Sequence, residues 1–363
     1  MQYPLKLVLL TVFMLTLAIP TLAQDDPTTF IEENPESVSV VCVQGDEVLV
    51  EHLADEPITL ASTSKMIILA EYARQVAFGN LDPDAEIALD DVELYHIAGT
   101  DGGAHEQWLS TLDPNAETVT MSQIVDGMMI FSTNSGADYV LAQLDDEGFT
   151  ELYDLFDMQN TDLPSSFLGN LLVLSNHELG ITDLEYVESL DQETFLAEEA
   201  RLLDLFLTDA DWREAELEFR DSLQVGLPEI DVQSAFFDQF TTQSTANDLL
   251  KLVQAPYTDS GLSEDAQIVM QGHLDWIFDV NPANEEVYEV LATKGGAYAG
   301  ILTTVWHVEA IGFEPISLVV LYHDLPANEW QQWLTTGDHQ ALELQVVATP
   351  AGCPVFADIL PEG

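Results

Sequence analysis

The sequence predicts a two-lobed α/β (α+β) fold, in which an antiparallel sheet built from both chain ends is flanked by helices and an all-helical lobe is inserted between them. Strand-like segments rich in β-branched residues lie at 37–52 and again at 284–325. Between these segments, apolar residues recur at the three- and four-residue spacing of helices. Short turns connect the last three strands, which indicates an antiparallel meander.

The N-terminus has the pattern of an export signal. Lys6 precedes an apolar run at 7–19, and Pro20 is followed by Thr21-Leu22-Ala23, which predicts cleavage after Ala23. The run is too short for a comfortable membrane span, and no later segment is long and apolar enough to be one. We therefore expect a signal peptide at 1–23, a secreted or periplasmic mature chain, and no membrane association after cleavage.

The composition is extremely acidic. The chain holds 65 Asp and Glu residues against 8 Lys and Arg, for a formal net charge of −57, and loss of Lys6 with the signal peptide makes it −58. Such a surface repels nucleic acid and anionic lipid and stays soluble where salt screens the repulsion. A salt-adapted habitat would explain it. No loop has the EF-hand pattern and the eight histidines show no ligand spacing, so we expect no metal and no other cofactor.

The mature chain is long enough to bury a large core, and 47% of the residues are hydrophobic. Cys42 and Cys353 are its two cysteines. In an oxidising compartment they either pair, tying the start of the fold to its end, or remain two buried free thiols. We expect a monomer.

The first part of the chain reads as a linker or short helix at 24–36, followed by strands at 37–43 and 47–52. Helical spacing begins at Ser62 and continues to Gly79. A polar, turn-rich section follows.

A helix of about three turns is expected at 120–131, because its apolar residues share one face. It breaks at 132–136 and resumes at 137–144. The acidic region 178–283 is largely helical. The end of the chain is expected to hold strands at 287–296, 299–310 and 314–325 and helices at 327–334 and 338–347.

These elements divide the chain into two lobes and a tail. Residues 37–58 and 284–350 are expected to form the α/β lobe, and 59–283 the helical lobe. Residues 351–363 are expected to be a C-terminal tail.

The first candidate motif is Ser62 with Lys65 one helical turn later on the same face. The N-terminus of a helix favours negative charge near the serine oxygen. A lysine whose pKa is lowered by burial or cationic neighbours can take the serine proton and make the serine a nucleophile. Alternatively, Ser62 only caps the helix and Lys65 is solvated.

The second motif, Ser132-Thr133-Asn134, lies in the break between two helices. Its hydroxyl and amide can relay a proton and hold a substrate carbonyl, or they can simply cap the following helix.

The third motif is Lys294-Gly295-Gly296 on a strand. Only three lysines follow the signal peptide, Lys65, Lys251 and Lys294, and two of them lie in these motifs. The alternative is an edge lysine that discourages aggregation. In so acidic a chain, a lysine kept for its chemistry is the better interpretation.

Together, the motifs resemble class A β-lactamases, within the superfamily of penicillin-recognising and D-alanyl-D-alanine peptidase-like serine hydrolases. Ser-x-x-Lys opening a helix, Ser-x-Asn between helices and Lys-[Thr/Ser]-Gly on a strand are the motif set of that family. The resemblance extends over most of the chain. It implies the β-lactamase fold and a small-molecule substrate, either a β-lactam or a peptidoglycan-type peptide.

The resemblance also implies a role for each catalytic residue. Ser62 is the acylated nucleophile and Lys65 helps to activate it. Ser132 passes a proton to the leaving nitrogen. Lys294 supplies positive charge to the substrate carboxylate and to Ser132.

The substrate-binding residues follow in the same way. Asn134 contacts Lys65 and the amide of the acyl side chain. Gly295, Gly296 and Ala297 line the substrate, and the N–H groups of Ser62 and Ala297 form the oxyanion hole.

The sequence departs from the family pattern at three points. Gly295 replaces the motif threonine or serine, which removes a hydroxyl that usually binds the substrate carboxylate. The loop at 158–180 lacks the Glu-x-x-Leu-Asn segment with the deacylating glutamate; Ser165 and Ser166 lie near that position, and Glu178 or Asp162 would have to substitute. The region at about 175–240 is longer than the family needs, which predicts an extra helical insertion beside the cleft.

Three functions are therefore considered. The leading one is an exported serine hydrolase that opens the β-lactam amide through a Ser62 acyl-enzyme, with antibiotic resistance as the role that the resemblance implies. Without the glutamate the acyl-enzyme is expected to turn over slowly, which weakens the case for efficient antibiotic destruction and leaves the acylation machinery intact. The second is a D-alanyl-D-alanine peptidase or esterase on the same fold. The third is a non-catalytic exported binding module that retains the fold.

Overall fold

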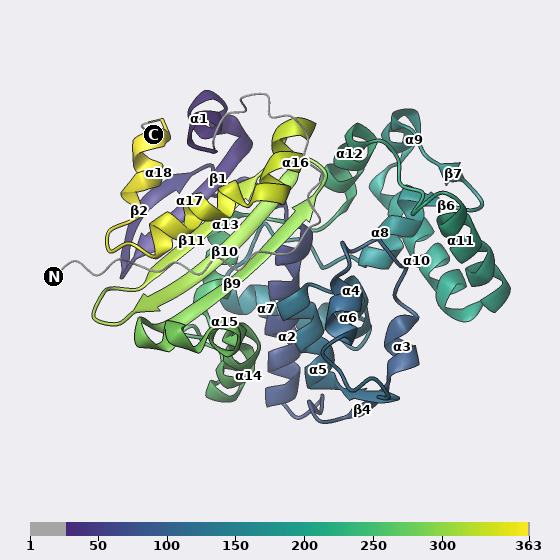
Figure 1. Ribbon diagram of the computed structural model, residues 1–363, viewed down its shortest axis with the longest axis horizontal. Helices are drawn as coiled ribbons and strands as arrows, with labels where there is room; N and C mark the ends of the chain where they lie inside the picture. The colour runs from purple at the N-terminus through teal and green to yellow at the C-terminus, as the bar shows by residue number, and fades with distance from the viewer. Residues whose placement is uncertain (1–26, 362–363) are drawn as a thin grey trace.

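The structure, a computed structural model, describes residues 27–361. The predicted signal peptide and its cleavage site after Ala23 lie outside these residues. A sheet with helices on both faces adjoins a group of helices, and a further set of helices extends beyond that group (Figure 1). Within residues 27–361, the helices lack the combination of length and apolar composition that crossing a membrane requires.

One five-stranded sheet joins the two ends of the chain, in the order β2-β1-β11-β10-β9. These strands are β2 (Glu47–His52), β1 (Val38–Gln44), β11 (Ile316–Tyr322), β10 (Ile301–Ala310) and β9 (Tyr288–Tyr298). Every pairing is antiparallel, and β1 pairs directly with β11, where Val40 lies opposite Val320. The predicted fold class, with a sheet built from both chain ends and a C-terminal meander, is confirmed.

Strands β1, β10 and β11 are buried along most of their length on both faces. Continuous apolar strands of this kind occur where both faces of a sheet are covered. One face packs against α1 (Pro27–Glu33), α16 (Ala327–Thr336), α17 (Asp338–Val347) and α18 (Pro354–Ile359). On the other face α13 (Ala246–Gln254) lies against β11, β10 and β1.

The expected C-terminal tail at 351–363 is wrong, because these residues contain α18. Pro354 occupies the first turn of this helix, where its missing N–H costs nothing, and Phe356 is fully buried. A proline opening a short apolar segment is a helix-start signal that the sequence reading overlooked.

The structure pairs Cys42 of β1 with Cys353, the residue immediately before α18. Both cysteines are fully buried in the cluster between the sheet and its outer helices. Of the two alternatives left open by the sequence, the structure shows the disulfide, which ties the first strand to the last helix.

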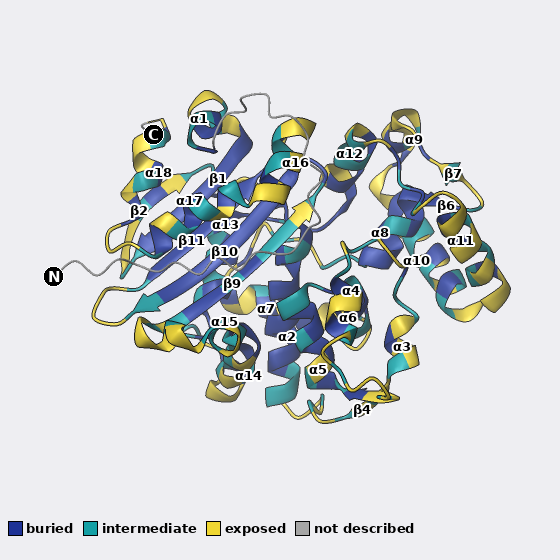
Figure 2. Ribbon diagram, in the orientation of Figure 1, coloured by how far each residue is buried: buried dark blue, intermediate teal, exposed yellow. Residues whose placement is uncertain are grey.

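Helix α2 (Lys65–Ala77) runs through the middle of the helical lobe (Figure 2), and every residue from Lys65 to Arg74 is buried. A 3-10 turn, Ala61–Ser64, leads into it, so Ser62 stands at its N-terminal end as predicted. The helices of this lobe are α3 (Leu89–Glu93), α4 (Ala104–Leu109), α5 (Met121–Asp126), α6 (Asn134–Leu141), α7 (Asp146–Phe156), α8 (Phe167–Leu174), α14 (Glu264–Leu274) and α15 (Trp276–Val280).

A π-helical turn, Gly127–Phe131, follows α5, and the chain breaks at Ser132 before α6 begins. Short strand pairs brace the loops: β3 (Ile58–Thr59) with β8 (Gln243–Ser244), β4 (Glu86–Ala88) with β5 (Thr118–Thr120), and β6 (Ser175–Asn176) with β7 (Gly180–Ile181). The connection that carries Ser132, between the π-helical turn and α6, is irregular. The Ser132 side chain faces Lys65 at the start of α2.

Beyond α8, the chain forms α9 (Leu184–Ser189), α10 (Gln192–Thr208), α11 (Ala210–Ser222) and α12 (Ile230–Phe240). We call this segment the insertion. It builds a core with α8 in which the rings of Phe195, Phe236 and Phe240 pack together. Helix α10 packs along α8. The insertion is thus anchored on the helix that directly follows Ser165 and Ser166.

Loss of the Cys42–Cys353 disulfide should lower the free energy of unfolding. The cysteines are 311 residues apart, and in the chain-entropy account a loop of this length contributes about 6 kcal/mol. We expect a reducing agent to lower the urea midpoint of the wild type but not that of the Cys42→Ala/Cys353→Ala variant, which starts lower. An unchanged wild-type midpoint after verified reduction would show that packing alone holds α18.

Candidate active site

The three predicted motifs converge at one point. Lys65 Nζ lies 3.1 Å from Ser62 Oγ and 3.3 Å from Ser132 Oγ, and Lys294 Nζ lies 2.9 Å from the same Ser132 oxygen. The start of α2, the break before α6 and strand β9 each supply a part. The result is a continuous chain of hydrogen-bonded groups from Ser62 through Lys65 and Ser132 to Lys294, which we call the relay.

The Lys65 amine has more oxygen neighbours than it has protons. Besides the two hydroxyls, its Nζ lies 2.7 Å from the carbonyl oxygen of Ser132 and 2.8 Å from Asn134 Oδ1. An ammonium group donates three hydrogen bonds and accepts none, whereas a neutral amine has a lone pair. With four oxygens in reach, the geometry suits an amine that accepts a proton from one hydroxyl. The predicted contact between Asn134 and Lys65 is present.

Both lysines of the relay are buried, and burial lowers their pKa values. Burial first, and then the nearby charge of Lys294, holds the pKa of Lys65 well below its usual range, while Asp138 and Asp101 oppose this shift. Burial lowers the pKa of Lys294 to about 7. The lowered pKa of Lys65 favours its neutral amine, which is the form that can accept a proton.

The two lysines are also unusual in having no ion-pair partner. Within residues 27–361, neither Lys65 nor Lys294 has a carboxylate oxygen within 4 Å. Most other basic side chains are neutralised: Arg74 by Glu71 and Glu151, Arg201 by Glu178 and Glu198, Arg220 by Glu216, and Lys251 by Asp248. Among the lysines of residues 27–361, the two without an ion-pair partner thus lie at one place.

The backbone on each side of the relay is in the left-handed region. Ala61 has φ +47° and Ser132 has φ +69°, which costs a residue other than glycine about 1–3 kcal/mol. Thr303 of β10 helps to hold the turn at Ala61, since its hydroxyl donates to the carbonyl of Leu60 at 2.7 Å. Thr63 donates to the same carbonyl at 2.7 Å. The sheet therefore fixes the turn that presents Ser62.

Strand β9 approaches Ser62 so closely that only glycine fits at 296. A Cβ atom on Gly296 would lie 2.5 Å from the backbone nitrogen of Ser62 and 2.8 Å from the carbonyl oxygen of Leu60. At Gly295 the nearest atoms to an added Cβ are 3.7 Å away, so the missing motif hydroxyl is not excluded by lack of space. Ala297 follows on the edge strand and is exposed.

The loop before α8 places no carboxylate next to Ser62 or Lys65. The N–H of Ser165 donates to Thr242 Oγ1, and the Ser166 hydroxyl caps α8 by accepting the N–H of Gly169. The next residue, Phe167, is buried, and its ring lies over Lys65 with Nζ 4.4 Å from the ring centre. An aromatic ring thus covers the amine on the side of this loop.

Neither Glu178 nor Asp162 substitutes for the missing acid. Glu178 accepts a hydrogen bond from Trp212 Nε1 at 2.8 Å and pairs with Arg201, both in the insertion. Asp162 accepts the N–H of Gln243 at 3.1 Å and is exposed. Glu178 thus hydrogen-bonds within the insertion and Asp162 hydrogen-bonds to β8, so both carboxylates are engaged in contacts outside the relay.

Sequence reasoning missed Asp138, Phe167, Glu199 and Thr303. Asp138 lies one helical turn after Asn134 on α6, a spacing that places both side chains on one face and could have identified it. Burial raises the pKa of Asp138 to about 7. The other three reach the site only through tertiary packing, for which no local pattern exists.

The part of the chain from 27 to 361 holds no group of three His, Cys, Asp or Glu side chains arranged to bind a metal ion.

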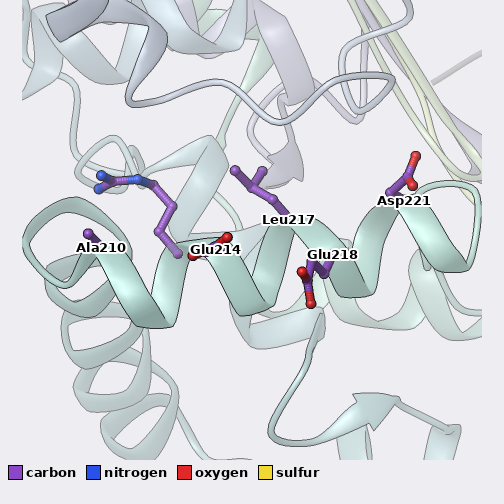
Figure 3. Close-up of a pocket in the computed structure, with 6 residues that line it drawn as sticks. Ala210, Glu214, Leu217, Glu218 and Asp221 are labelled. Carbon is purple, nitrogen blue, oxygen red and sulfur yellow. The ribbon is translucent and has the colours of Figure 1, made fainter.

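A hollow of about 350 Å³ lies along α11 in the insertion (Figure 3), lined by Ala210, Arg213, Glu214, Leu217, Glu218 and Asp221. Arg213 donates to the carbonyl oxygens of Phe206 and Leu207. The side chains that line this hollow include three carboxylates and no nucleophilic group. We therefore place the candidate active site at the relay and not in this hollow.

Comparison with known proteins identifies the family of this chain. The sequence model of the beta-lactamase enzyme family matches residues 24–275, which confirms the resemblance seen in the motifs. A search of curated proteins finds no match to this sequence.

Three similar solved structures are beta-lactamases. The one from Sphaerobacter thermophilus is 16% identical, with 88% of this chain and 95% of that chain covered and a TM-score of 0.54. A class A enzyme from Mycobacterium abscessus is 17% identical (87% and 98% covered, TM-score 0.50). A variant of the class A enzyme of the last common ancestor of Gram-negative bacteria is 13% identical (91% and 96% covered, TM-score 0.52). At these identities the likeness shows a shared fold.

A side chain at 296 should be far more damaging than one at 295. Gly296→Ala forces a methyl group against backbone atoms of the Ser62 turn, and overpacking of this kind costs about 1–3 kcal/mol. Gly295→Ala, the matched control, places its methyl group in ordinary contact. Urea unfolding of both variants measures the difference, and equal stabilities would contradict the close approach of β9 to Ser62.

Proposed function

Because this chain belongs to the beta-lactamase enzyme family, we propose that it is a serine hydrolase that opens the amide bond of a β-lactam through an ester at Ser62. The relay is the observation that supports this proposal. It joins a serine hydroxyl to a buried amine of lowered pKa, and the amine to a second hydroxyl beside another lysine. These are the groups that acyl transfer from an amide requires.

Acylation begins when the neutral amine of Lys65 takes the Ser62 proton and Ser62 Oγ bonds to the lactam carbonyl carbon. The carbonyl oxygen becomes an oxyanion between the N–H groups of Ser62 and Ala297. The close approach of Gly296 to the Ser62 nitrogen supports this placement. Each oxyanion donor of this kind contributes about 3–4 kcal/mol in measured cases.

Ring opening breaks the carbon–nitrogen bond and requires a proton on the leaving nitrogen. The Lys65 ammonium formed in the first step passes a proton to Ser132 Oγ, which gives its own proton to the nitrogen. Lys294 lies 2.9 Å from that oxygen and stabilises it during the transfer. The products are an opened ring and an ester at Ser62, with Lys65 neutral again.

Hydrolysis of the ester needs a base that activates water. The loop before α8 contributes two hydroxyls and the Phe167 ring, and Asp138 accepts the backbone N–H groups of Phe167 and Leu168. Since no carboxylate of residues 27–361 hydrogen-bonds to Ser62 or Lys65, we propose that deacylation is the slow step and that the acyl-enzyme accumulates.

A D-alanyl-D-alanine peptidase or an esterase is the second candidate, and the position of Phe167 favours it. The phenyl ring over Lys65 would shield the Ser62 ester from water. This suits an enzyme that is inactivated by a β-lactam, which stays bound as an ester, and that is not inactivated by a natural ester or peptide. The same Ser62 chemistry serves both functions.

We also propose that the chain is exported and meets a small anionic substrate outside the cytoplasm. The pattern at 1–23 supports export. Against the strongly acidic surface, Lys294 supplies positive charge for an anionic substrate at the relay while its amine is protonated.

Incubation with penicillin should add the mass of one penicillin molecule to the protein. Ser62→Ala should abolish the adduct because the attacking oxygen is gone. Ser222→Ala, on the exposed surface of the insertion, should label like the wild type. Intact-mass spectrometry over time measures both steps.

The time course separates the candidates. A persistent adduct at Ser62 supports slow deacylation, and its rapid disappearance with opened penicillin in solution supports a competent lactamase. Hydrolysis of an ester or D-alanyl peptide by the wild type but not by Ser62→Ala supports the second candidate. No adduct and no hydrolysis, or labelling that survives Ser62→Ala, would contradict the serine hydrolase.

Non-covalent affinity for penicillin should weaken as the pH rises above about 7. Lys294 is cationic below its pKa of about 7 and loses its attraction for the penicillin carboxylate above it, approaching about tenfold per pH unit. Calorimetry on Ser62→Ala measures the affinity without reaction. The methyl ester of the same penicillin is the control and should show no such decline; parallel profiles for acid and ester would contradict the role of Lys294.

A further inference from the structure

Glu199 of α10 connects the insertion to the active-site loop. Its Oε1 accepts the backbone N–H of Ser166 at 3.2 Å. The contact with α8 is tight, since a Cβ atom on Gly169 would lie 2.6 Å from Glu199 Cγ. Helix α10 thus delivers a carboxyl group to the residue directly before Phe167.

A second carboxyl group holds the next two residues. Asp138 of α6 accepts the N–H of Phe167 at 2.8 Å and that of Leu168 at 2.7 Å. Three successive backbone N–H groups, at 166, 167 and 168, are therefore accepted by two carboxyl groups that come from different parts of the fold. This arrangement leaves the segment little freedom.

The segment held in this way covers Lys65. The Phe167 ring lies over the amine, and the Lys65 side chain is fully buried. A narrow space lies beside the turn Ala61–Ser64, and it has no room for a water molecule. Phe167, Ser165 and Tyr298 are among the side chains that line it. An amine without water is less easily protonated. The exclusion of water from Lys65 therefore depends on the position in which the loop holds the Phe167 ring.

We propose that Glu199 is a positioning residue by which the insertion fixes the Ser166 segment, so that the Phe167 ring stays over Lys65 and excludes water from it. Glu199 contacts Ser166 rather than Ser62 or Lys65, so it acts through Phe167. The extra helices beside the cleft would then serve catalysis by maintaining the environment of the base. The consequence for acylation rests on the proposed function.

The role requires an acceptor oxygen rather than a negative charge. Burial, and next the charge of Asp138, raise the pKa of Glu199 to about 7. A carboxyl oxygen accepts the Ser166 N–H whether or not the group is ionised. An amide offers the same oxygen, so Glu199→Gln should preserve the function that Glu199→Ala removes. The other charged groups around Lys65 are Lys294 of β9, Asp138 of α6 and Asp101 before α4.

The scarcity of lysine provides a direct test. After removal of the predicted signal peptide, lysine labelled with ¹³C gives signals from Lys65, Lys251 and Lys294. We expect Glu199→Ala to raise the titration midpoint of Lys65 by at least about one pH unit, because water then reaches the amine. Glu199→Gln should stay close to the wild type. Lys251, paired with Asp248 on α13, is the internal reference and should not shift.

Matched variants define the outcome. Glu198→Ala removes the neighbouring carboxylate, which pairs with Arg201, and should leave Lys65 unchanged. Phe167→Ala should raise the Lys65 midpoint directly. Gly169→Ala displaces the Glu199 side chain without deleting it and should also raise the midpoint, so it replaces Glu199→Ala if that variant does not fold.

The proposal is overturned if Lys65 titrates as in the wild type in a folded Glu199→Ala or Gly169→Ala variant, or if Phe167→Ala does not move it. An equal shift in Glu199→Gln and Glu199→Ala would also contradict it. Because the titration uses no substrate, a protein that fails to react with penicillin can still pass this test, and the two proposals fail separately.

Discussion

Two buried lysine amines on either side of the Ser132 hydroxyl are the constraint around which this protein is organised. Burying an ammonium group without a counter-ion is unfavourable, and the group responds by giving up its proton more easily. The chain has many carboxylates that could neutralise Lys65 and Lys294, as they do most of its other basic side chains, yet in the described part of the chain none lies within ion-pair distance of either lysine. The reactivity of the site arises from these two buried lysines and the lowered pKa values that burial gives them.

The fold maintains the pair by bringing three rigid elements together. Helix α2 is buried from Lys65 to Arg74, which holds Lys65 and the preceding turn with Ser62 in place. The edge strand β9 lies against the same turn through Gly296, and Thr303 of the neighbouring strand holds the carbonyl before it. Strain in the backbone of Ser132 is tolerated because these elements surround it. The helices on the outer face of the sheet, closed by the disulfide, support β9 from behind.

Much of this could be predicted from the sequence, because the information is local. Continuous β-branched segments indicate the sheet, and Ser62, Lys65, Ser132 and Lys294 belong to short motifs with fixed spacing. Asp138 was within reach of the same reasoning, being one turn beyond Asn134. Phe167 and Glu199 were not: their roles arise from how the insertion packs on α8, and no spacing along the chain encodes that contact. The helix at Pro354 is short, but its opening proline is a local helix-start signal, so this helix too could have been predicted.

The central claim is that Lys65 acts as a proton acceptor and not merely as a positive charge. Lys65→Arg tests it most directly, because arginine keeps the charge and does not lose its proton in proteins. The measurement is the rate at which penicillin acylates Ser62, followed by mass spectrometry, in a variant whose folding has been verified. The account predicts a loss on the order of 10²–10⁴-fold, the usual contribution of a general base. Acylation within a few-fold of the wild type would contradict it.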